Sequence, residues 1–146
     1  MASSGMPARQ FSAAILGGSW PATDPLSCDI LARTQRLKAQ ELLDCADQTR
    51  GAVDRVVTSQ SGATITAFRT TGYQLASTFT DQADRYFAMG RASSECARIL
   101  SGLRTDLDRI DAKANAQIDQ LMRSATTGPA AAVARMQAIQ IIAHAR

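Results

Sequence analysis

The stretch TITAFRTTGYQLASTFTDQADRYFAMGRASSECARILSGLRTDLDRIDAKANAQIDQLMRS, residues 64–124, decides the fold. Along it, apolar and small side chains recur at alternating intervals of three and four residues, and no proline interrupts the pattern. This is the seven-residue repeat of a helix that keeps one face against a neighbouring helix. A single helix of this length would extend for roughly 90 Å and carry more apolar face than it can bury alone. The predicted row consists of Ile65, Phe68, Gly72, Leu75, Phe79, Gln82, Tyr86, Met89, Ser93, Cys96, Leu100, Leu103, Leu107, Ile110, Ala114, Gln117 and Leu121.

A second helix is predicted before this stretch, from about residue 25 to about residue 59. Asp24 can cap its free amides, and Pro25 suits the first helical position. Its own row contains smaller side chains, which let two helix axes approach closely. The short turn around Gly62 then forces the two helices to be antiparallel. The row of this second helix is Cys28, Ala32, Gln35, Ala39, Leu42, Ala46, Thr49, Val53 and Val56.

A third helix is predicted from about residue 130, after the turn at Thr126–Pro129. Its broad apolar face should cover the end of the long helix, and comprises Val133, Met136, Ile139, Ile142 and Ala143. We therefore expect an all-α, bundle-forming fold: a long antiparallel hairpin with helices at about 25–59 and 64–124, and a third helix.

The two ends of the chain differ from this helical pattern. Residues 1–17 are predicted to be a flexible N-terminal arm, with residues 11–16 either a helical turn or extended. Residues 18–146 are expected to be a single helical domain. The last helix has no stop signal, which favours a fragment of a longer protein. Trp20, in a loop with two glycines and two prolines, is either a packing anchor or a partner contact, and packing is favoured.

Charge and hydropathy exclude several classes of function. The net charge is +3, from 16 basic and 13 acidic residues that are interspersed along the chain. A nucleic-acid-binding protein would gather its basic residues on one stripe, so we expect no such binding. No apolar run approaches the roughly 20 residues that span a bilayer. The apolar segment Phe11–Gly18 is too short for a clear signal peptide, so we expect none that is cleaved.

The residues that carry enzymatic chemistry are sparse. His144 is the single histidine and lies near the C-terminus, without a partner nucleophile in a fixed frame. Asp106 and Asp108 should point to different faces of a helix rather than act as an acid–base pair. The sequence contains no glycine-rich phosphate loop and no zinc-type cysteine pair. We predict a protein that is not an enzyme and that uses no cofactor or metal.

Two of the three cysteines are predicted to meet. Cys28 and Cys96 each lie 34 positions from Gly62, on opposite sides of the turn. An antiparallel hairpin would therefore bring them level. A disulfide is one alternative, and two buried thiols that act as small apolar side chains are the other.

The segment before the first long helix and the turn around Gly62 resemble those of a known family. Gly18-Ser19-Trp20-Pro21-Ala22-Thr23-Asp24-Pro25, with Ser61-Gly62-Ala63 and Ala67-Phe68, resembles the Trp-x-Gly (WXG, Esx-like) superfamily of actinobacterial type VII secretion substrates, and the N-terminal domains of its effectors and polymorphic toxins. The family's Trp-x-Gly turn would fall at Gln60, Ser61 and Gly62, where Gly62 alone matches. The family's Tyr-x-x-x-Asp/Glu export signal is absent, and the resemblance implies that a partner could supply it.

The resemblance implies a targeting and partner-binding domain. Its partners would be small helical-hairpin (Esx-like) proteins, with the secretion ATPase as a further one. The protein would be cytoplasmic before export and secreted through a type VII system without a cleaved signal peptide. The rival hypothesis is a self-associating coiled-coil scaffold or adaptor with no secretion role. The residues expected to contact a partner are Trp20, Phe79, Tyr86, Met89, Leu100, Leu103, Leu107 and Ile110.

Overall fold

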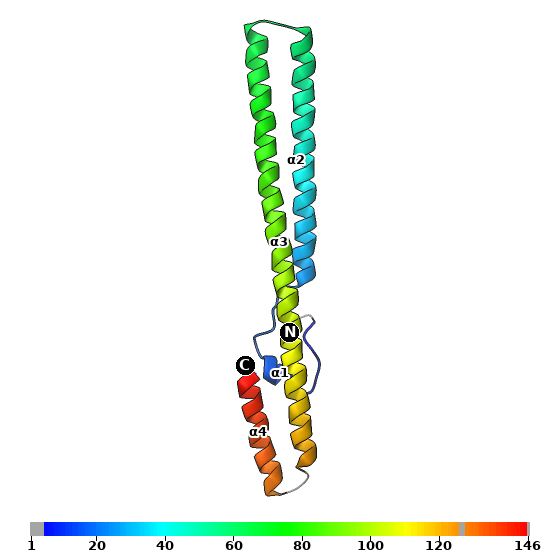
Figure 1. The fold of residues 1–146 in the computed structure, drawn as a ribbon, viewed down its shortest axis with the longest axis vertical. Helices are drawn as coiled ribbons and strands as arrows, with labels where there is room; N and C mark the ends of the chain where they lie inside the picture. Colours follow the sequence, from blue (N-terminus) through cyan, green and yellow to red (C-terminus); the bar gives the residue numbers. More distant parts are fainter. Residues whose placement is uncertain (1–4, 126–127, 146) are drawn as a thin grey trace. The chain divides into compact units, whose positions relative to one another are not determined.

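The computed structural model describes residues 5–125 and 128–145, and the described chain is all-α. The helices are α1 (Ser12–Leu16), α2 (Pro25–Ser59), α3 (Ala63–Ser124) and α4 (Pro129–Ala145). Helices α2 and α3 pack as a hairpin, and α4 packs on α3 (Figure 1). This confirms the predicted fold class and places every predicted helix end within one residue. The predicted turn residues Thr126 and Thr127 lie outside the described residues.

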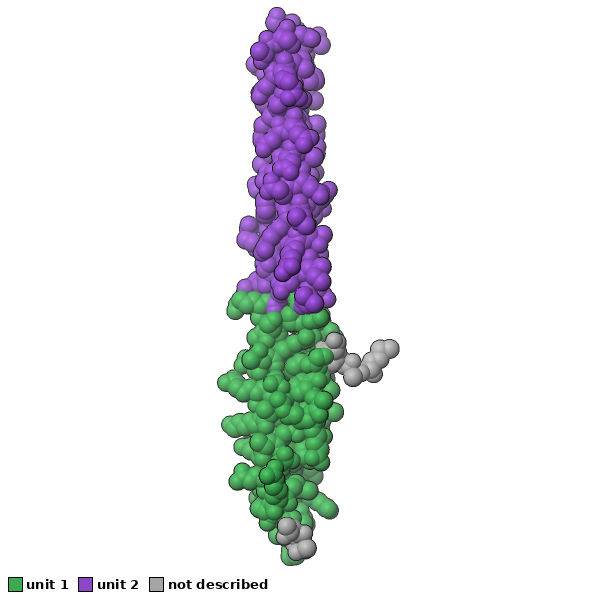
Figure 2. Space-filling view, turned by 90° about the vertical axis from the view of Figure 1, so that its right-hand side faces the viewer, with its two compact units in different colours: residues 1–25, 98–146 green, residues 26–97 purple. Residues whose placement is uncertain are grey.

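The chain divides into two compact units (Figure 2). Unit 1 comprises residues 1–25 and 98–146, and unit 2 comprises residues 26–97. Unit 2 therefore contains nearly all of α2 and the first half of α3. Unit 1 contains α1, the second half of α3 and α4. We describe each unit by itself.

The contact between α2 and α3 in unit 2 is centred on small side chains. On α2 the buried positions are Ala32, Gln35, Ala39, Leu42, Ala46 and Val53, which are members of the predicted row. On α3 the buried positions follow a seven-residue interval and are Ala76, Ala83, Gly90 and Ala97. Small residues on both helices allow the backbones to approach closely, so the hairpin is held along an alanine-rich line.

Half of the predicted α3 row is displaced by one residue. Gly72, Phe79, Tyr86 and Ser93 are partly buried, as a contact row requires. The positions expected between them, such as Leu75 and Met89, are exposed, and the residue after each is buried instead. The physical reason is size: alanine and glycine on α3 match the alanines of α2, whereas leucine and methionine would hold the helices apart.

Two glycines of α3 show how close this approach is. A Cβ atom added to Gly72 would lie 2.3 Å from a methyl group of Val53. One added to Gly90 would lie 3.3 Å from the backbone oxygen of Ala32. Glycine lowers helix propensity by about 1 kcal/mol relative to alanine, so packing must offset that cost at both positions. The turn itself contains Gly62, whose φ of +122° lies in a region that side chains disfavour.

Unit 1 has a core of larger side chains. Ile15, Leu16, Trp20 and Ile118 are buried together with Ala114 and Ala138, which joins α1 and the following loop to α3 and α4. The N-terminal segment was expected to be a flexible arm over residues 1–17. Residues 1–4 lie outside the described residues, but Ser12–Leu16 form a helix whose Ile15 and Leu16 are among the most buried side chains.

Helix α4 packs through a face that only partly coincides with the one expected. Its buried residues are Ala134 and Ala138, and Ile141, Ile142 and Ala145 are partly buried against the core. Of the predicted face, Ile142 packs as expected, whereas the other four residues are exposed: Val133, Met136, Ile139 and Ala143. Because α4 is apolar on nearly every side, periodicity did not identify the packed face.

Within the described ranges, no helix is long and apolar enough to cross a membrane.

Candidate partner-binding surface

One side of the hairpin in unit 2 is bridged by hydrogen bonds. We define the bridged flank by the residues four positions after each buried alanine or glycine: Arg36, Leu43 and Arg50 of α2, and Thr80, Phe87 and Ser94 of α3. Arg36 donates a hydrogen bond to the Ser94 hydroxyl at 2.8 Å, and Arg50 donates one to the Thr80 hydroxyl at 3.1 Å. Leu43 and Phe87 pack against the Ala39–Leu42–Ala83 cluster between these bridges.

The opposite side of the hairpin has one such bridge among the described residues, a hydrogen bond from Ser93 to the Gln35 side-chain oxygen at 2.8 Å, and otherwise exposes mainly apolar side chains. We define the open flank by two rows with a seven-residue interval that run through the residues before buried alanines or glycines. The rows are Leu31, Cys45 and Ala52 of α2, and Phe68, Leu75, Met89 and Cys96 of α3, where Ala52 and Phe68 continue the interval without preceding an alanine or glycine. Because the helices are antiparallel, the preceding positions of both helices lie on the same side of the contact line. Leu31, Phe68, Leu75 and Met89 remain between 45% and 50% exposed. Lys38 and Gln82 interrupt the two rows.

The difference between the flanks follows from the alanine contact. A close approach of two helices leaves no room between them for large side chains, so these lie at the edges. On the bridged flank, arginines and hydroxyls close the edge. On the open flank the large side chains stay half in water, which is the arrangement of a helix face that a further helix can cover.

The predicted partner contacts are distributed over several environments. Met89, Leu103 and Ile110 are exposed, and Met89 belongs to the open flank. Phe79 and Tyr86 are half-buried against α2, and Leu107 packs against the core of unit 1, while Leu100 is partly buried. The structure therefore leaves three of the eight residues well exposed. Periodicity had placed Phe68 and Leu75 in the contact row, and it did not single out Leu31.

Trp20 packs inside unit 1. Its side chain is 8% exposed and belongs to the core cluster with Ile15 and Ile118. The guanidinium of Arg104 lies 5.6 Å from the ring centroid, which is a cation–π distance. Arg104 also donates to the backbone oxygens of Pro21 and Thr23, and pairs with Asp24 at 3.3 Å. These contacts fix the loop before α2. The burial of Trp20 within its own chain agrees with the role of a packing anchor.

A polar cluster fixes the N-terminal segment to α3. Asp111 is fully buried and accepts hydrogen bonds from Arg9 at 2.8 Å, Ser12 at 2.6 Å and Asn115 at 3.0 Å. Arg9 also pairs with the exposed carboxylate of Asp108 at 2.7 Å. This hydrogen bond from Arg9 lowers the pKa of Asp108 below its ordinary value. No local sequence signal marks this cluster, because its two halves are about one hundred residues apart in the chain.

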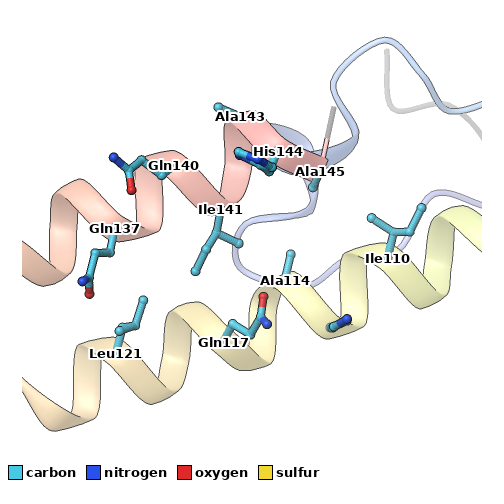
Figure 3. A pocket seen from close by; sticks show the side chains of 11 residues that line it. Ile110, Ala114, Gln117, Leu121, Gln137, Gln140, Ile141, Ala143, His144 and Ala145 are labelled. Atoms are coloured by element: carbon cyan, nitrogen blue, oxygen red, sulfur yellow. The ribbon is translucent and has the colours of Figure 1, made fainter.

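Unit 1 also has an open groove of about 870 Å³ between the end of α3 and α4. Ile110 and Leu121 of α3 and Ile141 of α4 contribute its apolar wall, and His144 lies at one end (Figure 3). Lys113, alanines, and glutamines from both helices line the rest, so the described lining places no carboxylate, hydroxyl or thiol beside the histidine. Among the described residues, no group of three or more His, Cys, Asp or Glu side chains could hold a metal ion.

The turn predicted as a secretion motif joins α2 and α3. Gln60, Ser61 and Gly62 are exposed there.

Comparison with known proteins identifies no relative: no family model matches the chain, and no similar curated protein or solved structure is found. The site is therefore interpreted from its own geometry.

Proposed function

We propose that the chain is a non-enzymatic targeting and partner-binding domain of a type VII secretion effector, which pairs with small helical-hairpin proteins for export. The observation that carries the binding part of this proposal is the open flank of unit 2. The type VII part rests on the resemblance of the Trp20–Pro25 segment and the Ser61–Ala63 turn. Export of the folded complex, without a cleaved signal peptide, belongs to the same proposal.

The size of the open flank favours a helical partner over a short peptide. Fully burying a side chain such as Leu, Met or Phe stabilises a complex by about 1.5–3 kcal/mol. Because Leu31, Phe68, Leu75 and Met89 are already half-buried, together they supply about 3–6 kcal/mol. Association itself costs at least about 4 kcal/mol. The interface must therefore extend along both rows, which a helix or hairpin lying beside α2 and α3 would do.

Co-expression tests the proposal. The chain is produced with each small helical-hairpin protein encoded beside it, and purified complexes are measured by light scattering. The expected result is a heteromer of defined mass. Leu75→Glu with Met89→Glu should weaken that complex by about 100-fold or more, because two charges would enter the apolar interface. The matched control, Ser77→Glu with Ala88→Glu, puts the same charges on exposed α3 positions away from the open flank.

Two results would contradict the proposal. One is a monodisperse monomer that captures none of these proteins. The other is a homodimer that forms from the chain alone and that the Leu75→Glu and Met89→Glu changes dissociate, which would support the rival hypothesis of a self-associating scaffold. Export is tested separately, by measuring whether the co-expressed chain appears in the medium of cells with and without an active type VII system.

A further inference from the structure

The two cysteines at the end of unit 2 lie within reach of each other. The Sγ atoms of Cys28 on α2 and Cys96 on α3 are 3.6 Å apart. A disulfide bond is about 2.05 Å long, so rotation of the two side chains about χ1 is the movement that bonding requires. The predicted register is thereby confirmed: the hairpin brings positions 28 and 96 level.

From this geometry we infer that unit 2 carries a redox-sensitive modification site, in which Cys28 and Cys96 form an intramolecular disulfide when the chain meets an oxidant of the small-molecule disulfide class. The inference does not depend on the proposed function, because it concerns contacts within the hairpin.

Solvent exposure assigns the order of the steps. Cys96 is exposed and Cys28 is partly buried, so the thiolate of Cys96 meets the oxidant RSSR first. Attack by Cys96 breaks the S–S bond of RSSR, forms a mixed disulfide and releases one RS⁻. The thiolate of Cys28 then attacks the Cys96 sulfur, forms the protein disulfide and releases the second RS⁻. Two protein thiols are oxidised, and RSSR is reduced to two RSH, which take up the two protons.

The position of this disulfide in the hairpin should make it stabilise unit 2. The hairpin is already closed at Gly62, and Cys28 and Cys96 are each 34 positions from that turn. A disulfide would therefore tie the two helices at the opposite end and convert unit 2 into a closed ring. Cross-linking a loop of this length restricts the unfolded chain strongly, so the oxidised hairpin should resist unfolding.

Cys45 is the natural internal control. It is exposed on α2 and lies about five turns along the helix from Cys28, so it cannot reach either member of the pair in the folded chain. Each chain should therefore contain one remaining thiol after oxidation, and the position of that thiol is known in advance.

The test uses the full chain incubated with oxidised glutathione. We expect the intact mass to fall by two hydrogen atoms, thiol labelling to fall from three sites to one, and peptide mapping to recover Cys28 joined to Cys96. The rate should not depend on protein concentration. The melting temperature of the oxidised chain should exceed that of the reduced chain by roughly 5–15 °C.

Three variants separate the outcomes. Cys28→Ser and Cys96→Ser should each abolish the mass loss and the shift in melting temperature, whereas Cys45→Ser should preserve both. Circular dichroism at matched temperature shows that each variant is folded. Three labelled thiols after oxidation, or a bond that includes Cys45 in a folded monomer, would overturn the inference.

Discussion

Unit 2 and unit 1 bury different kinds of side chain, and each accordingly leaves a different surface. The contact in unit 2 is centred on alanine and glycine, with Leu42 and Val53 as the larger apolar residues that it buries, and most other large apolar residues lie at the edges of the hairpin. In unit 1, Ile15, Leu16, Trp20 and Ile118 form a core. A buried polar cluster around Asp111 then fixes the N-terminal segment. A helix pair joined mainly by small residues therefore packs closely and leaves larger apolar side chains exposed along one flank.

The largest expected effect lies in the core of unit 1. Ile118→Ala should lower the free energy of unfolding by about 2–5 kcal/mol, because it removes a fully buried side chain and leaves a cavity. Chemical denaturation followed by circular dichroism measures the change. Met122→Ala, one turn along α3 at an exposed position, is the control and should have a much smaller effect. Equal losses in the two variants would mean that unit 1 has no large-residue core.

The second-largest expected loss of stability comes from removing the buried carboxylate of Asp111. Asp111→Ala removes the acceptor for Arg9, Ser12 and Asn115, and should cost about 2–3 kcal/mol of unfolding free energy. Proteolysis of the N-terminal segment should accelerate in the same variant, since α1 loses its attachment. Asp108→Ala, which removes an exposed carboxylate that also pairs with Arg9, provides the comparison and should be milder.

In unit 2, replacing a small buried residue by a larger one should lower stability. Ala83→Leu enlarges a fully buried position and should cost about 1–3 kcal/mol of unfolding free energy, because the helices must move apart. Ala88→Leu makes the same change at an exposed position of the same helix and should be nearly neutral. Denaturant titration compares the two, and a neutral Ala83→Leu would show that α2 and α3 do not approach closely along this line.

Acid should produce the smallest effect, through Asp108. Its hydrogen bond with Arg9 lowers the pKa of Asp108 below the ordinary value of 3.8, so the folded chain binds this proton less tightly than the unfolded chain. The contribution to stability is then complete above the unfolded pKa and is lost as the pH falls through the lower, folded pKa. Melting curves of the native chain and of Asp108→Asn should differ slightly near pH 7 and converge at about pH 2.

Much of this fold was predictable because its signals are local. Asp24-Pro25, Gly62 and Gly128-Pro129 mark helix ends, and the row on α2 was identified residue by residue. The buried row on α3 was only half right, because Leu75 and Ala76 are both apolar and size matching across the hairpin chooses between them. The Arg9–Asp111 contact and the packed face of α4 depend on tertiary packing, which one chain's periodicity does not contain.

The open flank was likewise predictable only in part: its residues form a local pattern, but their exposure depends on tertiary packing. A seven-residue row through Phe68, Leu75 and Met89 is visible in the sequence, but it was interpreted as part of the helix contact. Leu75 and Met89 are exposed because the next residues, Ala76 and Gly90, occupy the buried contact positions instead. The packing of Trp20 was predictable without knowledge of the tertiary contacts, because a lone tryptophan in a loop rich in glycine and proline usually packs against its own chain.

The most direct test of the central claim, that the open flank is covered by a helical partner, is the labelling rate of Cys45. In a Cys28→Ser, Cys96→Ser background Cys45 is the single thiol, and it lies on the open flank. We predict that maleimide labelling of Cys45 slows by about tenfold or more in the purified complex. A cysteine introduced by Ala88→Cys, with Cys45→Ser, should label at the same rate with and without the partner. Unchanged labelling of Cys45 in a complex of confirmed mass would contradict the account.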